Sequence, residues 1–297
     1  MGKTILVTGA TGNVGAEVVR LLQYTDHPFR VAVRNVDAVR ATLGTATEYV
    51  RFDFTDPTTF ADALRDVGQL FLIRPPAISQ VKRFIYPAID TARAAGVEHI
   101  VFLSLLGAER NPFVPHRQIE TYIQASGISY TFLRASFFMQ NLNTVHRQDI
   151  QQEGEIFLPA GMGKTSFIDV RDIAEVATIA LLEREHRNQA YELTGSQSLD
   201  YYQVADIFTS VLGTKIVYSN PSILAFARRM AARGLPMEFI VVMIGIYTVA
   251  RLGLAGRVAP DTARVLGRAP CTMQQYVEDY QNCWRSPGTE PVSCDQA

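Results

Sequence analysis

The sequence predicts an α/β protein with a doubly wound parallel Rossmann sheet and a smaller, mostly helical C-terminal lobe. Three observations lead to this prediction. Residues 5–7 form an aliphatic run typical of a strand that is buried on both faces. A glycine-rich turn follows, and then Val14, Val18 and Leu22 recur at helical spacing. Strand and helix patterns alternate through the first two-thirds of the chain, which favours a parallel sheet with right-handed crossovers.

The glycine turn, residues 8–15, has the pattern G-x-x-G-x-x-G between a strand and a helix. This context is typical of a dinucleotide-binding loop, although a glycine turn without a ligand is the alternative. Gly9 permits the tight turn, Gly12 lets the backbone approach a pyrophosphate, and Gly15 lets the helix pack closely on its strand. The free amides at the start of the helix then receive the phosphates. The predicted cofactor contacts in this turn are Gly9, Thr11, Gly12, Asn13 and Val14.

The remaining sheet elements follow from alternating patterns and turn residues. Expected strands cover residues 29–33, 48–54, 69–73, 99–104 and 129–133, and expected helices cover residues 36–43, 56–64, 79–95 and 115–125. Asp56 is a suitable N-cap residue with Pro57 at the first helical position. Gly96 and Gly127 follow the last two of these helices, where glycine readily adopts the left-handed conformation of a helix end.

After residue 134 the alternation loosens, which indicates a division of the chain. We expect an NAD(P)-binding Rossmann domain over residues 1–150 and a substrate-binding lobe with late sheet strands over residues 151–284. In that lobe the patterns predict helices over 172–182 and 201–212, short strands at 191–193 and 215–218, and mostly helices from 221 onward. Asp169 and Asp172 are interpreted as structural, with Asp172 as a helix cap. The polar stretch 285–297 is expected to be disordered.

Composition excludes several classes of function. The 297 residues carry 28 basic and 29 acidic side chains, and no basic stripe indicates a nucleic-acid or membrane-surface partner. The apolar run 239–250 is shorter than the ~20 residues of a membrane span, so we expect a buried helix or a pocket cover. Three cysteines without Cys-x-x-Cys spacing predict neither a disulfide framework nor a metal site. The first strand lies so close to Met1 that we expect no signal peptide and a cytoplasmic protein. A homo-oligomer is compatible with the sequence, which leaves the oligomeric state open.

The residue after the second expected strand indicates whether the chain prefers NADP(H) or NAD(H). Enzymes that prefer NAD place an acidic residue there to hold the ribose hydroxyls, but this chain has Arg34. An arginine pairs well with a 2′-phosphate, so NADP(H) is preferred and NAD(H) is the alternative. Arg34 can also stack on adenine or lie exposed in solvent. Asp53 and Phe54 end the third strand, where the carboxylate can accept from the adenine amino group or simply cap a turn.

The fourth expected strand ends at Ile73, Arg74, Pro75 and Pro76. Ligands of parallel sheets bind outside the carboxyl ends of the strands, so this segment is expected to pass beneath the dinucleotide. Ile73, Arg74 and Pro75 are therefore candidate cofactor contacts. The two prolines stiffen a wall, and Pro76 is a candidate substrate contact. Arg74 reaches phosphate or substrate, or it is solvated.

Four motifs together resemble the NmrA-like family of atypical short-chain dehydrogenases/reductases. They are residues 8–15, 102–107, 130–141 and 167–174, and the resemblance extends from about residue 3 to about residue 215. It implies a dinucleotide-binding fold and adds Ser104 and Phe137 as candidate cofactor contacts. It also implies one of two functions. Some members resemble NAD(P)H-dependent reductases of quinones, dyes or aromatic ethers, whereas others sense the dinucleotide without turning it over. An isomerase or cyclase that retains the cofactor is a third reading.

The proton donor is the open question. The Tyr-x-x-x-Lys pair of classical members is absent, because no tyrosine precedes any lysine by four residues. His116 is the candidate catalytic residue, since Glu120 lies one helical turn away and can hold it protonated or orient it. The alternative is an ordinary ion pair on a helix surface.

Reduction of a quinone, an imine or a dye needs no strong acid, because the cofactor supplies the difficult chemistry. We therefore expect an NADP(H)-dependent oxidoreductase that acts on a flat, apolar small molecule. Candidate substrate contacts after the sixth strand are Phe138, Met139 and Asn141, together with the apolar run 239–250. Core packing explains the same apolar side chains.

Overall fold

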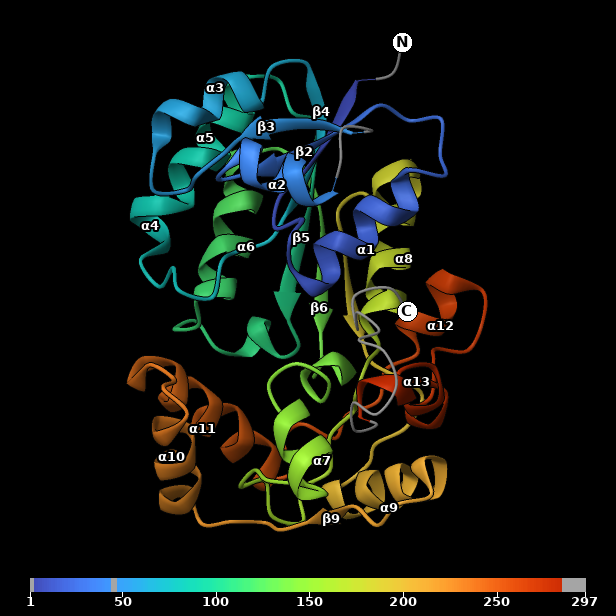
Figure 1. The fold of residues 1–297 in the computed structure, drawn as a ribbon. Helices are drawn as coiled ribbons and strands as arrows, with labels where there is room; N and C mark the ends of the chain where they lie inside the picture. Colours follow the sequence, from blue (N-terminus) through green and yellow to red (C-terminus); the bar gives the residue numbers. More distant parts are fainter. Residues whose placement is uncertain (1–2, 44–46, 285–297) are drawn as a thin grey trace. The chain divides into compact units, whose positions relative to one another are not determined.

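The computed structural model describes residues 3–43 and 47–284 (Figure 1). The expected disorder of 285–297 lies outside the described residues. The chain divides into two compact units. The sheet unit comprises Met1–Ala135, Val170–Leu193 and Arg264–Gly267, and the helical unit comprises Ser136–Asp169, Thr194–Ala263 and Arg268–Ala297.

The sheet unit contains seven parallel strands in the order β3-β2-β1-β4-β5-β6-β8. The strands are β1 (Thr4–Val7), β2 (Phe29–Val33), β3 (Glu48–Arg51), β4 (Val67–Leu72), β5 (His99–Leu105), β6 (Ser129–Ala135) and β8 (Gln189–Leu193). The strand order reverses between β1 and β4, so the predicted doubly wound parallel sheet is confirmed. Ile5, Leu6 and Val7 are wholly buried, as expected of a central strand.

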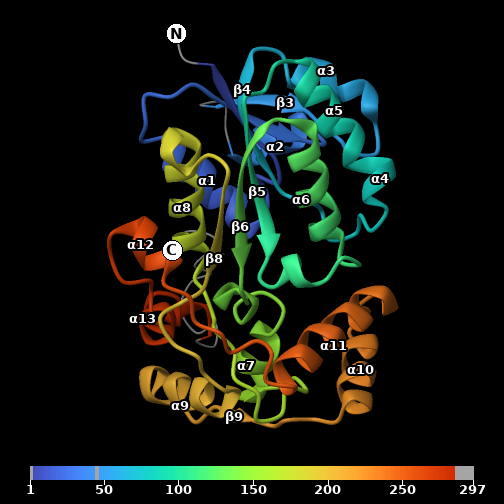
Figure 2. The same cartoon turned by 180° about the vertical axis from the view of Figure 1, so that it is seen from behind.

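Helices cover both faces of this sheet. On one face α1 (Asn13–Leu22) packs against α8 (Val170–Leu182), and on the other lie α3 (Phe60–Ala63), α5 (Tyr86–Ala94) and α6 (Pro115–Ser126) (Figures 1 and 2). Two more helices, α2 (Val36–Leu43) and α4 (Val81–Phe84), complete the unit's connections. Phe102 and Phe132 from neighbouring strands join Ile119 and Ile123 of α6 in one buried core. Apolar burial between the sheet and α6 therefore fixes the position of α6.

Three expected helices differ in their bounds. Residues 79–95 form α4 and α5 instead of one helix, because Pro87 has no N–H to continue the helical hydrogen-bond ladder. Residues 56–64 begin with the 3₁₀ helix η1 (Pro57–Thr59), whose Asp56 cap accepts from the amide of Thr58. Helix α8 begins at Val170, so the expectation that Asp172 is its cap was wrong, and Asp172 lies in the first turn.

The helical unit is built around an aromatic core. Its helices are α7 (Arg147–Glu153), α9 (Tyr201–Leu212), α10 (Ile223–Ala232), α11 (Met237–Arg251) and α13 (Met273–Asp279), and α12 (Asp261–Leu266) contributes to both units. Strands β7 (Glu155–Ile156) and β9 (Val217–Tyr218) form a small parallel sheet. The remaining 3₁₀ helices are η2 (Ala108–Arg110), η3 (Met139–Asn141), η4 (Arg184–His186) and η5 (Gln281–Cys283). Phe208, Phe226 and Tyr276 are wholly buried in the core.

Helix α11 contains the apolar run that was expected to form a buried helix or a pocket cover. Ile240, Met243 and Tyr247 are indeed buried, but Val241 and Val242 are 60% and 56% exposed. Burial therefore holds for one face of the helix only. Apolar residues lie all around α11, but only those on one face pack against the core. No helix in the described ranges has both the length and the apolar character needed to cross a bilayer.

A buried polar pair joins α7 to α11 in this unit. Nε2 of His146, the residue before α7, is hydrogen-bonded to the hydroxyl of Tyr247. Burial lowers the pKa of His146 to about 4, although the charge of Asp149 acts in the opposite direction. Burial also raises the pKa of Tyr247. Both side chains are therefore neutral near pH 7.

Replacing His146 with Gln should flatten the acid sensitivity of folding. The unfolded imidazole binds a proton near its ordinary pKa of 6.5, whereas the folded one stays neutral until about pH 4. Unfolding therefore takes up a proton in this window, and the free energy of unfolding falls as the pH falls. Between pH 6.5 and 5.5 the wild type should lose about 1 kcal/mol more than His146→Gln, measured by urea titration. Equal losses would mean that His146 contributes nothing to this pH dependence.

Candidate functional site

The glycine turn connects β1 to α1, and its three glycines have different roles. Gly9 has φ +67°, and its carbonyl accepts from the amide of Gly12 at 3.0 Å. A Cβ on Gly15 would lie 2.2 Å from that carbonyl oxygen, so Gly15 is required by the fold itself. A Cβ on Gly12 would meet only the same oxygen at 3.4 Å, an ordinary contact. The fold does not require glycine at residue 12, and the expected approach of a pyrophosphate to its backbone stays a prediction.

Thr8 ties this turn to the neighbouring strand β4. Its Oγ1 donates to the carbonyl of Phe71 at 2.9 Å and accepts from the amide of Ile73 at 2.9 Å. The ends of β1 and β4 are thus held together where the strand order reverses, which is where dinucleotides bind in such sheets. Sequence reasoning did not identify this role of Thr8. A buried threonine directly before a glycine turn is the signal for it.

Helix α1 presents a free amino-terminal end to this edge. Gly12 is its N-cap residue and so supplies no capping side chain. Thr11 and Asn13 are exposed, and Val14 is buried beneath the turn. The first amides of α1 have no capping oxygen, so they can donate to a phosphate. The predicted cofactor contacts of the turn lie together at this one helix end.

The ends of β2 and β3 place the adenosine-side candidates. Arg34 is exposed directly after β2, where the side chain of Asn35 accepts from the amide of Ala38 and starts α2. One carboxylate oxygen of Asp53 accepts from the amide and the hydroxyl of Thr55, at 2.9 and 2.8 Å. Asp53 therefore shapes its own turn, and its contact with adenine stays a prediction. Phe54 is buried.

The segment after β4 is held by its own arginine. Nη1 of Arg74 donates to the carbonyls of Pro75, Pro76 and Ile78 at 3.0, 3.1 and 2.7 Å. Burial lowers the pKa of Arg74 from its ordinary value. The guanidinium thus stiffens its loop, and the cofactor contact expected of Arg74 stays a prediction. Ile73 and Pro75 are half-buried, and Pro76 is exposed.

His116 lies on the first turn of α6, with its ring 6.1 Å from that of Phe102 on β5. Burial lowers the pKa of His116 to about 4, and the charge of Arg74 acts in the same direction, whereas Glu120 opposes it. The imidazole is therefore neutral near pH 7. The interpretation that Glu120 holds it protonated is wrong, because desolvation outweighs the single carboxylate. A catalytic role for a neutral His116 stays a prediction.

Glu120 instead forms the centre of a buried charge cluster. Its carboxylate, which is wholly buried, accepts from Nε and Nη2 of Arg134 at 3.0 and 2.9 Å. It also accepts from the hydroxyl of Ser104 at 2.7 Å and from Nη1 of Arg117 at 3.3 Å. Ser104 and Arg134 are register partners on β5 and β6, so both point to the face that α6 covers. Sequence reasoning missed Arg134, whose signal was a charged residue at an inward position of an apolar strand.

The substrate candidates after β6 belong to the helical unit. Phe137 and Phe138 are half-buried, Met139 is buried, and the amide of Met139 donates to the carbonyl of Ile168 at 2.9 Å. Asn141 ends η3 and is half-buried. Their predicted contacts with a cofactor or substrate stay predictions, as does that of Pro76 in the sheet unit. Asp169 accepts from the side-chain amide of Gln140 at 2.8 Å, which is consistent with its structural interpretation.

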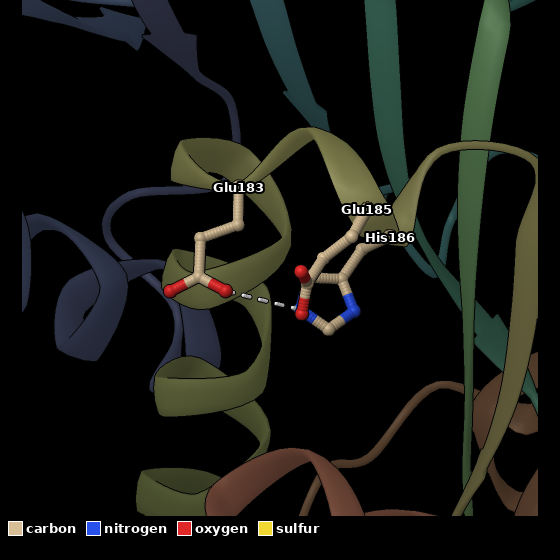
Figure 3. A group of neighbouring side chains, drawn as sticks. All are labelled: Glu183, Glu185 and His186. Atoms are coloured by element: carbon tan, nitrogen blue, oxygen red, sulfur yellow. Dashed lines mark ion pairs between the residues drawn. The ribbon is translucent and has the colours of Figure 1, made fainter.

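One further group combines residue types that bind metals, and it lies between α8 and β8 (Figure 3). Nε2 of His186 lies 3.4 Å from the carboxylate of Glu183 and 3.8 Å from that of Glu185. Its Nδ1 is hydrogen-bonded to the hydroxyl of Tyr191 at 2.8 Å. Both carboxylates are exposed. Exposed acidic groups of this kind are common without a metal ion, so we assign none to this group.

Comparisons with known proteins show which family and which enzymes the chain resembles. The NmrA-like family model matches residues 1–254. An NAD(P)H azoreductase of Xenophilus azovorans is 34% identical over 278 residues, covering 92% of this chain and 96% of the relative.

Two solved structures match in the same way. The Citrobacter sp. triphenylmethane reductase complexed with NADP(H) has a TM-score of 0.83 and 26% identity, covering 93% of this chain and 99% of that chain. The NADPH-dependent quinone oxidoreductase of Escherichia coli, complexed with NADPH, has a TM-score of 0.83 and 27% identity, with the same coverage.

Replacing Gly12 with Ala should weaken dinucleotide binding and leave the fold intact. The new methyl group meets only ordinary contacts inside the protein but occupies the approach to the α1 amides. We expect the Kd for NADPH, measured by calorimetry, to rise about tenfold or more with an unchanged melting temperature. Gly245→Ala is the matched control, because its Cβ meets nothing within 4 Å in helix α11. An unaltered Kd in Gly12→Ala would exclude this turn as the phosphate site.

Proposed function

The chain belongs to the NmrA-like family, and from this premise we propose that it is an NADP(H)-dependent oxidoreductase that transfers hydride to a flat, apolar, electron-poor small molecule. One observation of the structure carries the proposal more than any other. Gly12 is a glycine that the fold does not need, at the uncapped end of α1 and beside the reversal of strand order. That combination is what a pyrophosphate requires.

The preference for NADP(H) rests on the end of β2. Arg34 is exposed there, and an arginine can pair with a 2′-phosphate through two N–H groups, whereas an acidic residue would repel it. The two related enzymes of known structure were crystallised with NADP(H) or NADPH, which agrees with this reading. NAD(H) is the weaker alternative.

The substrate class follows from the absence of a strong acid among the candidate catalytic groups. When bound, NADPH supplies the hydride. The protein's own contribution is to hold the reactants and exclude water. The neutral His116 can form one hydrogen bond with the substrate. A quinone, an imine or a conjugated dye suits such a site, because its reduced product is protonated by water or a weak donor. The related enzymes are named for azo, triphenylmethane and quinone substrates, which share this property.

The candidate substrate contacts are those that the sequence predicts. Phe138 and Met139 offer apolar surface to a flat ring, and Asn141 offers a polar group that can orient it. Pro76 extends the proline wall after β4. These assignments rest on side-chain chemistry and on the position of each residue after a strand end.

The purified protein should oxidise NADPH when a menadione-type quinone is added. The measurement is the loss of reduced-nicotinamide absorbance, with repeated turnovers expected for each protein molecule. Azo and triphenylmethane dyes extend the panel. Tight NADPH binding without turnover on the whole panel would contradict the proposal and favour a dinucleotide sensor. Product formation without net NADPH consumption would favour an isomerase or cyclase instead.

Replacing Arg34 with Glu should reduce NADPH affinity much more than NADH affinity. Loss of a charge-assisted contact to the 2′-phosphate and the new repulsion predict a rise in the Kd for NADPH of about ten- to hundredfold. The Kd for NADH, which lacks that phosphate, should change little. Arg184→Glu makes the same charge change on the exposed η4, at the opposite end of the sheet, and serves as the control. Equal losses for both dinucleotides would remove Arg34 from the phosphate site.

A further inference from the structure

Ser104 is the polar residue at the carboxyl end of β5, and its hydroxyl has a fixed direction. The hydroxyl donates its single hydrogen to the Glu120 carboxylate at 2.7 Å. A serine hydroxyl has one donor hydrogen and two acceptor lone pairs, so Ser104 can only accept from any further partner. We propose that Glu120, held by Arg134, is a positioning residue that makes Ser104 an obligate acceptor for the carboxamide NH₂ of the nicotinamide.

The direction of this hydrogen bond depends on the charge of Glu120. Two nitrogens of Arg134 bind the carboxylate side-on, and Arg117 adds a third contact. A carboxylate that faces two guanidinium groups accepts from them and has no hydrogen to donate. A hydroxyl that donates to an anion also becomes a stronger acceptor, because successive hydrogen bonds polarise one another.

The position of Ser104 matches the nicotinamide half of the cofactor, and this step rests on the proposed function. It is the second-last residue of β5, in the half of the sheet that starts at β4. The phosphate-binding turn follows β1, next to β4, so a dinucleotide that crosses the reversal extends from the turn toward β4 and β5. Arg134 and Arg117 pair with Glu120 directly, so the ion pair itself forms without the serine hydroxyl.

The proposed contact selects one rotamer of the carboxamide. That group has an NH₂ donor at one end and a carbonyl acceptor at the other. An acceptor-only Ser104 binds the NH₂ end, whereas a serine free to donate would bind the carbonyl. The contact would fix the ring orientation, and with it the face from which hydride leaves.

The direct test compares two oxidised cofactors on the unmodified protein. The 3-acetylpyridine analogue of NADP⁺ keeps the carbonyl but replaces the NH₂ with a methyl group. We expect its Kd, measured by calorimetry, to be about three- to tenfold higher than that of NADP⁺, the effect of one hydrogen bond. Ser104→Ala should bind both cofactors equally, and Ser126→Ala, whose hydroxyl bonds within the end of α6, should still discriminate. Equal Kd values on the unmodified protein would overturn the proposal.

A second set of variants tests whether Glu120 acts through Ser104. Glu120→Gln offers an amide donor, so Ser104 can reverse its hydroxyl and discrimination should disappear. In a Ser104→Ala background the same change should add no further loss of NADP⁺ affinity. The Kd for adenosine 2′,5′-bisphosphate, which lacks nicotinamide, should be the same in every variant. An additional loss of NADP⁺ affinity in the double variant, or a loss for the fragment, would reduce Glu120 to a structural role.

Two safeguards keep this test separate from folding and from turnover. Glu120→Gln leaves a buried Arg134 without its anion and is liable to unfold. In that case the Ser104→Ala variant and the 3-acetylpyridine analogue test the proposal by themselves, since neither disturbs the ion pair between Glu120 and Arg134. All readouts are binding constants, so a protein that discriminates but does not turn over would refute the proposed function and keep this inference. Turnover without discrimination between the two cofactors would support the proposed function and refute this inference.

Discussion

The close approach of Gly15 to the carbonyl of Gly9 controls the geometry of the edge where the cofactor would bind. No side chain fits there, so α1 lies directly on the end of β1. Thr8 then joins that strand end to β4 through two hydrogen bonds of one hydroxyl. The helix amides and the two central strands are thereby fixed relative to one another before any ligand arrives, which reduces the ordering cost of binding.

The charges beneath this edge obey a different constraint. A wholly buried carboxylate is costly unless its charge and its lone pairs are met. Glu120 meets that condition with two arginines and a serine drawn from α6, β5 and β6. Such a cluster gives little net stability over apolar packing, but it fixes directions. Each hydrogen bond to Glu120 has one possible donor, so the polarity of the whole cluster is determined.

Local patterns in the sequence predicted most of the fold, and long-range contacts explain the rest. The bounds of β2, α2 and α9 match the expected ones, since periodicity and end signals act over a few residues. The Glu120 cluster was missed because its members lie 14 and 16 residues apart and meet only through strand register. The sequence left the charge state of His116 open for a related reason: its i+4 carboxylate is visible in the sequence, but its desolvation is not. The exposed face of α11 likewise depends on what packs nearby.

The neutral His116 and the hydrogen bond from Ser104 to Glu120 together limit the chemistry proposed for the site. His116 is neutral, and the Ser104 hydroxyl already donates its hydrogen bond to Glu120. The candidates on β5 and α6 therefore include no strong proton donor. A simple ketone would become an unstabilised alkoxide on hydride addition and would need such a donor. A quinone or a conjugated dye instead spreads the incoming electron pair over its ring system. For the proposed hydride transfer, the lack of a strong proton donor among these residues would favour acceptors that carry their own electron sink.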